Sequence, residues 1–250
     1  MNKNWVIEEL IRVARLFVSD DDTKEDVEAD KKRRRKKVKS VRLLAQDITK
    51  LRHHITRDLK SDDEKTRMTA LAVALIDKTS ERVGNDDSAA GGHFGVTGWR
   101  AKHVSISGGK VKLTYTGKSG VDHEKEFTDT QIAKMLRECS SRSEKGRRLL
   151  TTSDGFEIKA DKVNRYLSAF DVTAKDLRGY GANRYVVEAL QAAPDTIEGE
   201  DGRKKYFSDV LKRVADRVGH QKATLKTHYL LPGIEETYVK HGRVKNLKNA

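Results

Sequence analysis

The sequence is poor in cysteine, proline and aromatic residues: its 250 residues include 1 Cys, 2 Pro and 6% Phe, Trp and Tyr together. The single Cys139 excludes an internal disulfide and is typical of a reducing compartment, so we expect it to serve in packing. No stretch approaches the roughly 20 apolar residues of a membrane-spanning helix, and we expect no signal peptide. A chain of this length can form one large or two modest domains with a real core.

Positive charge exceeds negative charge along the chain. The sequence contains 51 Lys and Arg against 38 Asp and Glu, a net charge of +13, which favours a polyanion, and first of all nucleic acid, as partner. Residues 1–30 hold nine acidic and four basic residues, whereas residues 31–60 hold thirteen basic and two acidic ones. The basic run at 31–37 is typical of a solvated helix start or a flexible arm, with contact to DNA phosphates or a nuclear address as functional alternatives.

Most of the chain has the periodicity of amphipathic helices. Apolar spacing and capping signals predict helices at 6–17, 41–59, 61–83, 128–141, 159–170, 173–192, 204–218 and 234–241. Ser61 with Glu64, and Thr173 with Asp176, are capping-box pairs that mark helix starts, and Gly219 suits a helix end. Residues 19–30 are acidic and nearly devoid of apolar side chains, which indicates a linker.

One region changes to the period of β-strands. Short runs at 102–106, 110–116 and 121–127 are separated by glycine-containing turns, which predicts a three-stranded antiparallel meander. Lys118 would lie at the tip of its second hairpin. The sequence therefore predicts a mainly helical α+β fold with one small sheet, divided into an N-terminal helix and charged linker at 1–37 and a catalytic domain at 38–250.

The segment Gly219–Tyr229 carries the most specific chemistry. A tyrosine hydroxyl, whose ordinary pKa is roughly 10, attacks a phosphodiester only where cations stabilise the developing charge. We therefore expect basic side chains from elsewhere in the chain to gather around Tyr229. The candidates are Arg82, Lys118, Lys175, Arg178 and His220.

Five stretches in order resemble type IB DNA topoisomerases of the poxvirus and bacterial kind, across roughly residues 38–242. They are ERVGN at 81–85, GVTGWRAKHV at 95–104, YTGKSGVDH at 115–123, KDLRGYGAN at 175–183 and GHQKATLKTHYLLP at 219–232. Each is weak alone, but all five in this order, with His220 nine residues before Tyr229, form a specific signature. The resemblance implies the fold shared by tyrosine recombinases and these topoisomerases.

The resemblance also assigns roles to individual residues. It implies Tyr229 as nucleophile, Arg82 and Arg178 as phosphate-binding arginines, His220 as a phosphate-binding histidine, Lys118 as general acid and Lys175 as a second proton-relay lysine. It further implies DNA-binding roles for Asn183, Arg100 and Lys226, with Asn183 in a supporting part.

The implied reaction makes a covalent 3′-phosphotyrosyl DNA with a free 5′ hydroxyl, and resealing then relaxes supercoils of either sign. Positioning and charge neutralisation suffice for such a transfer, so we expect no metal, ATP or other cofactor, and the sequence has no Walker loop. The expected partner is double-stranded DNA, and we expect the protein to bind it as a monomer. We expect no association with a membrane. The expected location is the cytoplasm or nucleoid, or the nucleus or a viral factory for a eukaryotic or viral source.

Two other functions fit parts of the sequence. A tyrosine recombinase shares this catalytic plan, but usually has His where K-D-L-R has Lys175; synapsis and strand exchange would identify it. A DNA-binding protein without catalysis is the second alternative. Members of the resembled family carry a β-rich domain before the catalytic one, and the two domains together close around the duplex. The chain is therefore either a catalytic fragment or closes around DNA by other means. With fewer phosphate contacts, we expect weaker and more salt-sensitive DNA binding.

Other polar residues are expected to be structural. We interpret the remaining histidines as surface or strand residues rather than metal ligands, with DNA contacts open to two of them, His123 and His228. Tyr180 and Tyr185 are expected in the core. The adjacent Asp86 and Asp87 indicate turn chemistry. The remaining histidines are His53, His54, His93, His103, His123, His228 and His241.

Overall fold

The computed structural model describes residues 24–143 and 146–244, so the helix predicted at 6–17 lies outside the described residues. The chain divides into two compact units, residues 1–38 and 39–250. All side chains discussed below belong to the second unit. The division predicted from the sequence, with its linker and catalytic parts, stays a prediction.

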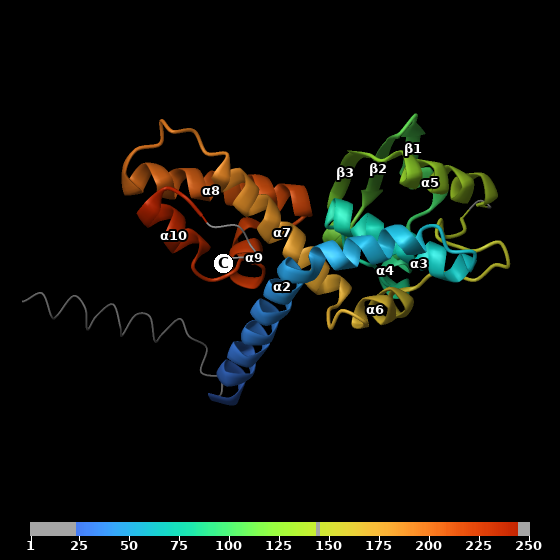
Figure 1. Cartoon of the computed structure of the whole chain (residues 1–250), viewed down its shortest axis with the longest axis horizontal. Coiled ribbons are helices and arrows are strands. Elements are labelled where there is room, and N and C mark those ends of the chain that lie inside the picture. The colour runs from blue at the N-terminus through green and yellow to red at the C-terminus, as the bar shows by residue number, and fades with distance from the viewer. Residues whose placement is uncertain (1–23, 144–145, 245–250) are drawn as a thin grey trace, which may run out of the picture. The chain divides into compact units, whose positions relative to one another are not determined.

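The second unit is built mainly from helices (Figure 1). The helices are α2 (Lys24–Asp58), which begins in the first unit, α3 (Glu64–Thr79), α4 (Asp86–Ala90), α5 (Thr130–Arg142), α6 (Ala160–Ser168), α7 (Ala174–Gln191), α8 (Gly199–Val218), α9 (Lys222–His228) and α10 (Ile234–His241). Short 3-10 turns lie at Val96–Gly98, Ala101–His103 and Lys118–Gly120. Among the described residues, no helix has the length and apolar character needed to cross a membrane.

A three-stranded antiparallel sheet stands beside α5, with β1 (Val104–Ser107), β2 (Lys110–Thr116) and β3 (Asp122–Thr128) in sequence order. In the second hairpin Tyr115 pairs with His123, and Lys118 lies in the connecting turn. The predicted α+β fold with a small antiparallel sheet is therefore confirmed. β1 begins two residues later than predicted, because Ala101–His103 forms a 3-10 turn.

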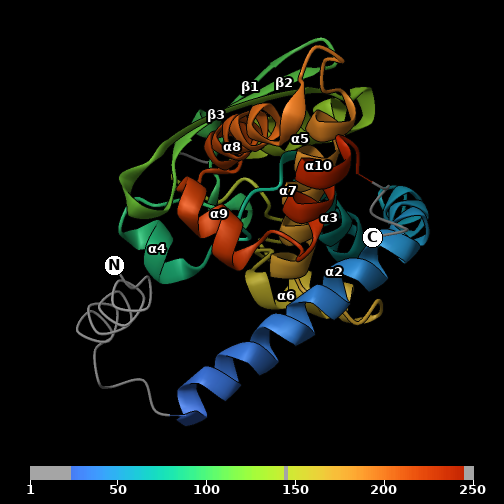
Figure 2. The ribbon, with the colours of Figure 1, turned by 90° about the vertical axis from the view of Figure 1, so that its left-hand side faces the viewer.

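Helix α7 is the most buried long element and packs against both α3 and α8. It can approach α3 closely because small residues occupy its middle: a side chain at Gly181 would overlap the Ser80 hydroxyl. Helix α8 in turn contacts α9 and α10, and Figures 1 and 2 both show these helices beside α7. The predicted start of α7 is confirmed, since Thr173 and Asp176 form a reciprocal capping box.

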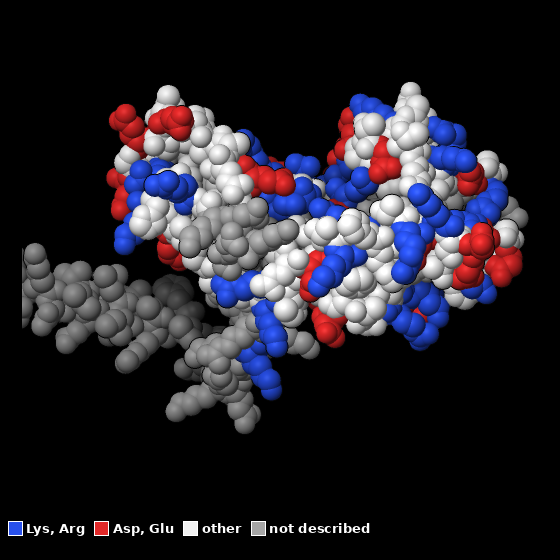
Figure 3. Space-filling model, viewed as in Figure 1, with Lys and Arg blue, Asp and Glu red and all other residues white. Residues whose placement is uncertain are grey.

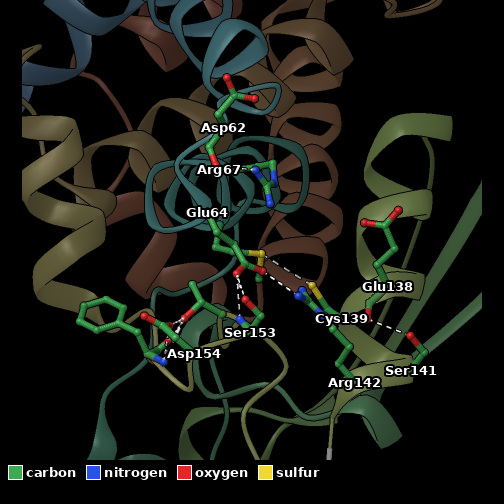
Figure 4. A network of polar contacts seen from close by, with 12 residues as sticks. Asp62, Glu64, Arg67, Glu138, Cys139, Ser141, Arg142, Ser153 and Asp154 are labelled. Carbon is green, nitrogen blue, oxygen red and sulfur yellow. Dashed lines mark hydrogen bonds and ion pairs between the residues drawn. The ribbon is translucent and has the colours of Figure 1, made fainter.

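A polar cluster that we call the outer brace, Glu64, Arg142 and Ser153, joins α3 to α5 and to the segment after α5 (Figure 4). Glu64 accepts hydrogen bonds from Arg142 Nη1 at 2.7 Å and from the backbone N and Oγ of Ser153 at 2.9 and 2.5 Å. The bonds from Ser153 and the charge of Arg142 lower the pKa of Glu64 to about 2. Nearby, Cys139 is buried with its Sγ 3.8 Å from Met68 Sδ, which confirms its packing role.

Several helix boundaries differ from the prediction. Residues 24–30 belong to α2 rather than to a linker, because Lys and Glu have high helix propensity and acids suit a helix start. Helix α3 is capped by Asp63, whose carboxylate accepts from Thr66 N at 2.9 Å, and not by Ser61. It ends at Thr79, because Ser80 adopts a left-handed conformation with φ 55°.

Three later elements also differ from the prediction. Helix α8 begins at Gly199, five residues before the predicted start, and Lys222–His228 forms the unpredicted helix α9. Asp86 and Asp87 begin the short helix α4 behind the N-cap Asn85, so they lie in a helical turn rather than in a loop.

Candidate active site

Tyr229 follows directly after α9 and is 9% exposed. Its backbone is fixed on both sides: Tyr229 N donates to Leu225 O at 3.0 Å, and Asn183 Nδ2 donates to Tyr229 O at 2.8 Å. Asn183 Oδ1 also accepts from Leu231 N at 2.8 Å. The predicted nucleophile is therefore attached through its main chain to the middle of α7.

Arg178 lies five residues before Asn183 on α7 and directs its guanidinium at three oxygens. Nε donates to Ser80 O at 2.8 Å, Nη2 donates to Val218 O, and Nη1 donates to Tyr229 Oη at 3.4 Å. The residue is 3% exposed. Burial lowers the pKa of this guanidinium, and the nearby charge of Arg82 lowers it further. The bonds to Ser80 O and Val218 O orient the guanidinium so that Nη1 points toward the phenol.

His220 and Arg82 complete the cluster around Tyr229. The imidazole of His220 lies against the phenol ring, with ring centroids 4.4 Å apart and planes inclined by 42°. Arg82 Nη2 donates to the carbonyl of Gly219, the residue before His220, at 3.5 Å. The structure thus brings together four of the predicted site residues from three distant parts of the chain: Arg82, Arg178, His220 and Tyr229.

The local backbone explains why these side chains meet. Gly219 ends α8 with φ +65°, which turns the chain back toward α7. Val96 N donates to Arg82 O at 2.9 Å and Thr97 N to Val83 O at 2.8 Å, so the segment after α3 is held against the 3-10 turn at Val96–Gly98. The close approach of Gly95 to the backbone of Arg82 and Gly84 leaves no space for a side chain at that glycine.

Lys118 and Lys175 are both exposed. Lys118 begins the 3-10 turn at the tip of the second hairpin, where the sequence places it. Lys175 is the second residue of α7, three positions before Arg178, so both side chains lie on similar sides of the helix. Their roles in proton transfer stay predictions.

The three predicted DNA-binding residues differ in their surroundings. Asn183 is 1% exposed, and its side-chain amide forms hydrogen bonds with the backbone of Tyr229 and Leu231, while its DNA-binding role stays a prediction. Arg100 is partly exposed, with its guanidinium 5.4 Å from the Phe94 ring centroid. Lys226 is exposed and pairs with Glu235 at 2.7 Å. DNA contact by Arg100 and Lys226 stays a prediction.

A buried ionic cluster under the site was missed by sequence reasoning. Nδ1 of His123 and Nζ of Lys125 lie 3.2 and 3.1 Å from the same oxygen, Oε1 of Glu81. Burial raises the pKa of Glu81, but the bond to His123 and the charge of Lys125 outweigh it and bring the pKa to about 2. A lone Glu and a lone His 42 positions apart have no spacing signal that could have predicted this pair.

Two of the histidines predicted at surface or strand positions, His103 and His123, are buried. His123 lies in a strand, but it is buried, which corrects its predicted opportunity to touch DNA. His103 is also buried, and burial lowers its pKa to about 4. Tyr180 and Tyr185 are buried as predicted. In residues 24–143 and 146–244 no group of three or more His, Cys, Asp or Glu side chains is arranged to hold a metal ion.

The charged surface near the sheet is mixed in sign. Figure 3 shows Lys and Arg side chains gathered between α8 and β3. In this region Lys78, Lys125 and Arg217 line a pocket of about 280 Å³, together with acids that include Glu124 and Asp216. This pocket therefore does not have the uniform positive charge of a phosphate site.

The sequence that forms this helical core and the cluster around Tyr229 also matches a known protein family. The profile of the family described as eukaryotic DNA topoisomerase I, catalytic core, matches residues 25–242. Because this match includes most of the 250 residues, the chain belongs to that family. The resemblance to DNA topoisomerases predicted from the five stretches is thereby confirmed.

Individual relatives are distant and longer. DNA topoisomerase 1B of Acanthamoeba polyphaga mimivirus is 24% identical over 192 residues, 70% of this chain and 55% of the viral protein. DNA topoisomerase 1 alpha of Arabidopsis thaliana is 26% identical over 200 residues, 78% of this chain and 21% of the plant protein. DNA topoisomerase 1B of vaccinia virus (strain Copenhagen) is 26% identical over 136 residues, 54% of this chain and 42% of the viral protein. The chain spans about half or less of each of these relatives.

A solved structure of XerH site-specific recombinase bound to difH substrate is also similar. It has 15% sequence identity and a TM-score of 0.44, and the match covers 81% of this chain and 52% of that chain.

Proposed function

We propose that this chain carries the active site of a type IB DNA topoisomerase, which cuts and reseals one strand of double-stranded DNA through a covalent bond to Tyr229. The observation that supports this proposal most directly is the position of Arg178 Nη1, 3.4 Å from Tyr229 Oη, with the His220 ring against the same phenol. A tyrosine surrounded by fixed cationic donors suits attack on a phosphodiester, because negative charge grows on the phosphate oxygens as the reaction proceeds.

The chemistry follows from these positions. The bond from Tyr229 Oη to phosphorus forms as the bond from phosphorus to the 5′ oxygen breaks, and the phenolic proton passes to solvent. Arg82, Arg178 and His220 would stabilise the non-bridging oxygens through charge-assisted hydrogen bonds. Lys118, assisted by Lys175, would donate a proton to the departing 5′ oxygen, help that is typically worth about 10² to 10⁴ in rate.

Resealing is the reverse reaction. The free 5′ hydroxyl attacks the phosphotyrosyl bond and Tyr229 leaves, so the energy of the original phosphodiester is retained and no nucleotide is consumed. Between the two steps the cut strand can rotate about its partner. We further propose that the chain acts as a monomer, because all the residues assigned above come from one copy.

A plasmid assay tests this function. Supercoiled plasmid is incubated with the protein in EDTA without ATP, and the distribution of linking numbers is measured. We expect relaxation of both positive and negative supercoils. Tyr229→Phe should abolish relaxation and leave DNA affinity within about twofold, since only the nucleophilic oxygen is lost. Tyr206→Phe is the matched control, because the Tyr206 hydroxyl bonds to Ala189 O away from the site.

The same assay separates the alternatives. Binding without any change in linking number would favour a non-catalytic DNA-binding protein, and relaxation by Tyr229→Phe would refute the assigned nucleophile. Exchange of strands between two joined sites would favour a recombinase. The residue three positions before Arg178 is Lys175, where recombinases usually have His, and this supports the topoisomerase.

A further inference from the structure

The buried histidine of β3, His123, contacts the chain directly beside three of the predicted catalytic residues. Its side chain is 2% exposed, so it is closed off from solvent and from any DNA on the surface. Its ring is stacked on Tyr115 of β2, with centroids 5.1 Å apart and planes within 5° of parallel. The stack fixes the plane of the imidazole, and the contacts at its edge show what the ring supports.

The first contact is with the residue before Arg82. Nδ1 of His123 lies 3.2 Å from Oε1 of Glu81, and the Glu81 side chain is 2% exposed. The nearby Lys125 Nζ, 3.1 Å from the same oxygen, balances the charge of the carboxylate. A buried carboxylate held by two partners has a fixed orientation, so the segment that carries Arg82 is fastened to β3.

The second contact is with the residue before Lys118. Gly117 has φ −94°, a conformation that any residue can adopt, so its backbone does not require glycine. A Cβ atom at this position would, however, stand 2.6 Å from Nε2 of His123. The imidazole therefore occupies the space of a side chain at 117, and the turn that carries Lys118 rests on the ring.

The third contact is with the residue before His220. A Cβ atom at Gly219 would overlap Cε1 of His123, so the end of α8 also rests on the imidazole. The carbonyl of Gly219 accepts the hydrogen bond from Arg82 Nη2 at 3.5 Å, which links the first and third contacts. One ring thus lies against the neighbours of Arg82, Lys118 and His220.

We propose that His123 is a positioning residue for DNA cleavage, whose imidazole sets the spacing between the segments of Arg82, Lys118 and His220. It acts through Glu81, Gly117 and Gly219 and touches neither the DNA nor Tyr229. This inference rests on the proposed function, because it concerns the geometry of that reaction. A displacement of about 1 Å among groups that act on one phosphate can lower a rate by about 10²-fold, so loss of the ring should affect the rate of chemistry rather than DNA affinity.

The test is single-turnover cleavage of a short DNA duplex by the full chain. We expect His123→Ala to slow cleavage by about 10- to 100-fold and to change the dissociation constant for DNA by less than about twofold. His123→Asn should cleave at least fivefold faster than His123→Ala, because the amide N–H of the new side chain can reach Glu81 from nearly the position of Nδ1. Leu136→Ala, at a fully buried site of α5, controls for lost stability and should cleave at the normal rate below its melting temperature.

A second substrate separates the Lys118 contact from the others. In a duplex whose scissile 5′ oxygen is replaced by sulfur, the leaving thiolate needs no proton, so misplacement of Lys118 should matter less. We expect the defect of His123→Ala to shrink at least fivefold on this substrate. An equal defect on both substrates would refute the support of Lys118 by His123.

Gly117→Ala tests the same contact with the histidine in place. Its methyl group would press on Nε2, so we expect at least tenfold slower cleavage even if His123→Ala does not fold. Gly202→Ala is the matched control, because its methyl group would meet only Ile197 at an ordinary 3.6 Å. Normal cleavage by folded His123→Ala or by Gly117→Ala would overturn the proposed role of His123 alone. Absence of cleavage by the unmodified chain would instead refute the proposed function, and the role with it.

Discussion

Two carboxylates, Glu64 and Glu81, share a pKa of about 2 but lie in different surroundings. Glu64, in the outer brace, is 19% exposed, and its low pKa comes first from the hydrogen bond of the Ser153 hydroxyl. Glu81 is 2% exposed, and its low pKa results from partners that overcome the effect of burial. The same pKa therefore accompanies a surface brace in one region and a buried support beside Arg82 in the other.

This difference determines what each carboxylate contributes. When one member of a buried ion pair is removed, its partner is left as an unpaired charge that water cannot reach. The partners of a partly exposed carboxylate can instead be solvated after its loss. We therefore expect changes at Glu81 to affect both folding and catalysis, and changes at Glu64 to affect folding only slightly.

The largest effect is expected for Glu81→Gln, which keeps the shape of the side chain and removes its charge. His123 and Lys125 would lose their common anion, so the free energy of unfolding should fall by roughly 3 kcal/mol or more. Cleavage should slow at least tenfold as the Arg82 segment loosens. Urea denaturation and single-turnover cleavage measure the two effects. A variant as stable and as active as the unmodified chain would remove the distinction between the two carboxylates.

Asn183→Ala is expected to have the next largest effect. It removes the hydrogen bonds that fix Tyr229 O and Leu231 N, so the free energy of unfolding should fall by about 2 kcal/mol and cleavage should slow about tenfold. Asn164→Ala is a control, because Asn164 Oδ1 accepts a bond from Ala174 N at the start of α7. It should lower stability by about 1 kcal/mol with normal cleavage. Equal cleavage defects in both variants would argue against a specific role for Asn183.

Glu64→Gln should have a smaller effect at neutral pH. It keeps one oxygen acceptor for Arg142 or Ser153 and loses the ionic part of the brace, so we expect the free energy of unfolding to fall by about 1 kcal/mol. Cleavage should be unchanged. Thermal denaturation and the plasmid assay measure the two quantities, and slower relaxation by this variant would mean that the brace also shapes the site.

The smallest expected effect is the pH dependence of that difference. The pKa of Glu64 is about 2 in the folded protein against an ordinary value of 4.5, so its ionised form favours folding. This contribution is fully present above pH 4.5 and is lost as the pH falls toward 2. The stability difference between the unmodified chain and Glu64→Gln should therefore shrink across this range in urea titrations. A constant difference would indicate that the carboxylate acts by packing.

Local signals in the sequence predicted much of the fold. The capping box of Thr173 and Asp176, the glycine at 219 and the alternating strands were each predicted from neighbouring residues, and each is present in the structure. Predictions failed where tertiary contacts decide a boundary. Helix α3 ends at Thr79, because the next residue, Ser80, is left-handed; the Ser80 carbonyl accepts from Arg178, and the Ser80 hydroxyl lies against Gly181 of α7.

The site was predictable only in part for the same reason. The grouping of Arg82, Arg178, His220 and Tyr229 was expected from motifs, and the structure brings these residues together. The short helix α9 was missed because it has a single buried residue, Leu225, and therefore no apolar period. The support from Glu81 and His123 depends on a pairing between distant segments, which leaves no periodic or spacing pattern.

The attachment of Tyr229 to α7 through Asn183 has a mechanical consequence. In the proposed reaction DNA is joined to this tyrosine, and torque from the turning duplex would act on the tyrosine side chain. The two hydrogen bonds of the Asn183 side-chain amide would transmit this force from the backbone of Tyr229 and Leu231 to α7, an 18-residue helix that also carries Arg178. The phosphate joined to Tyr229 and the guanidinium of Arg178 would then be supported by the same helix, so that they move together and stay aligned for resealing.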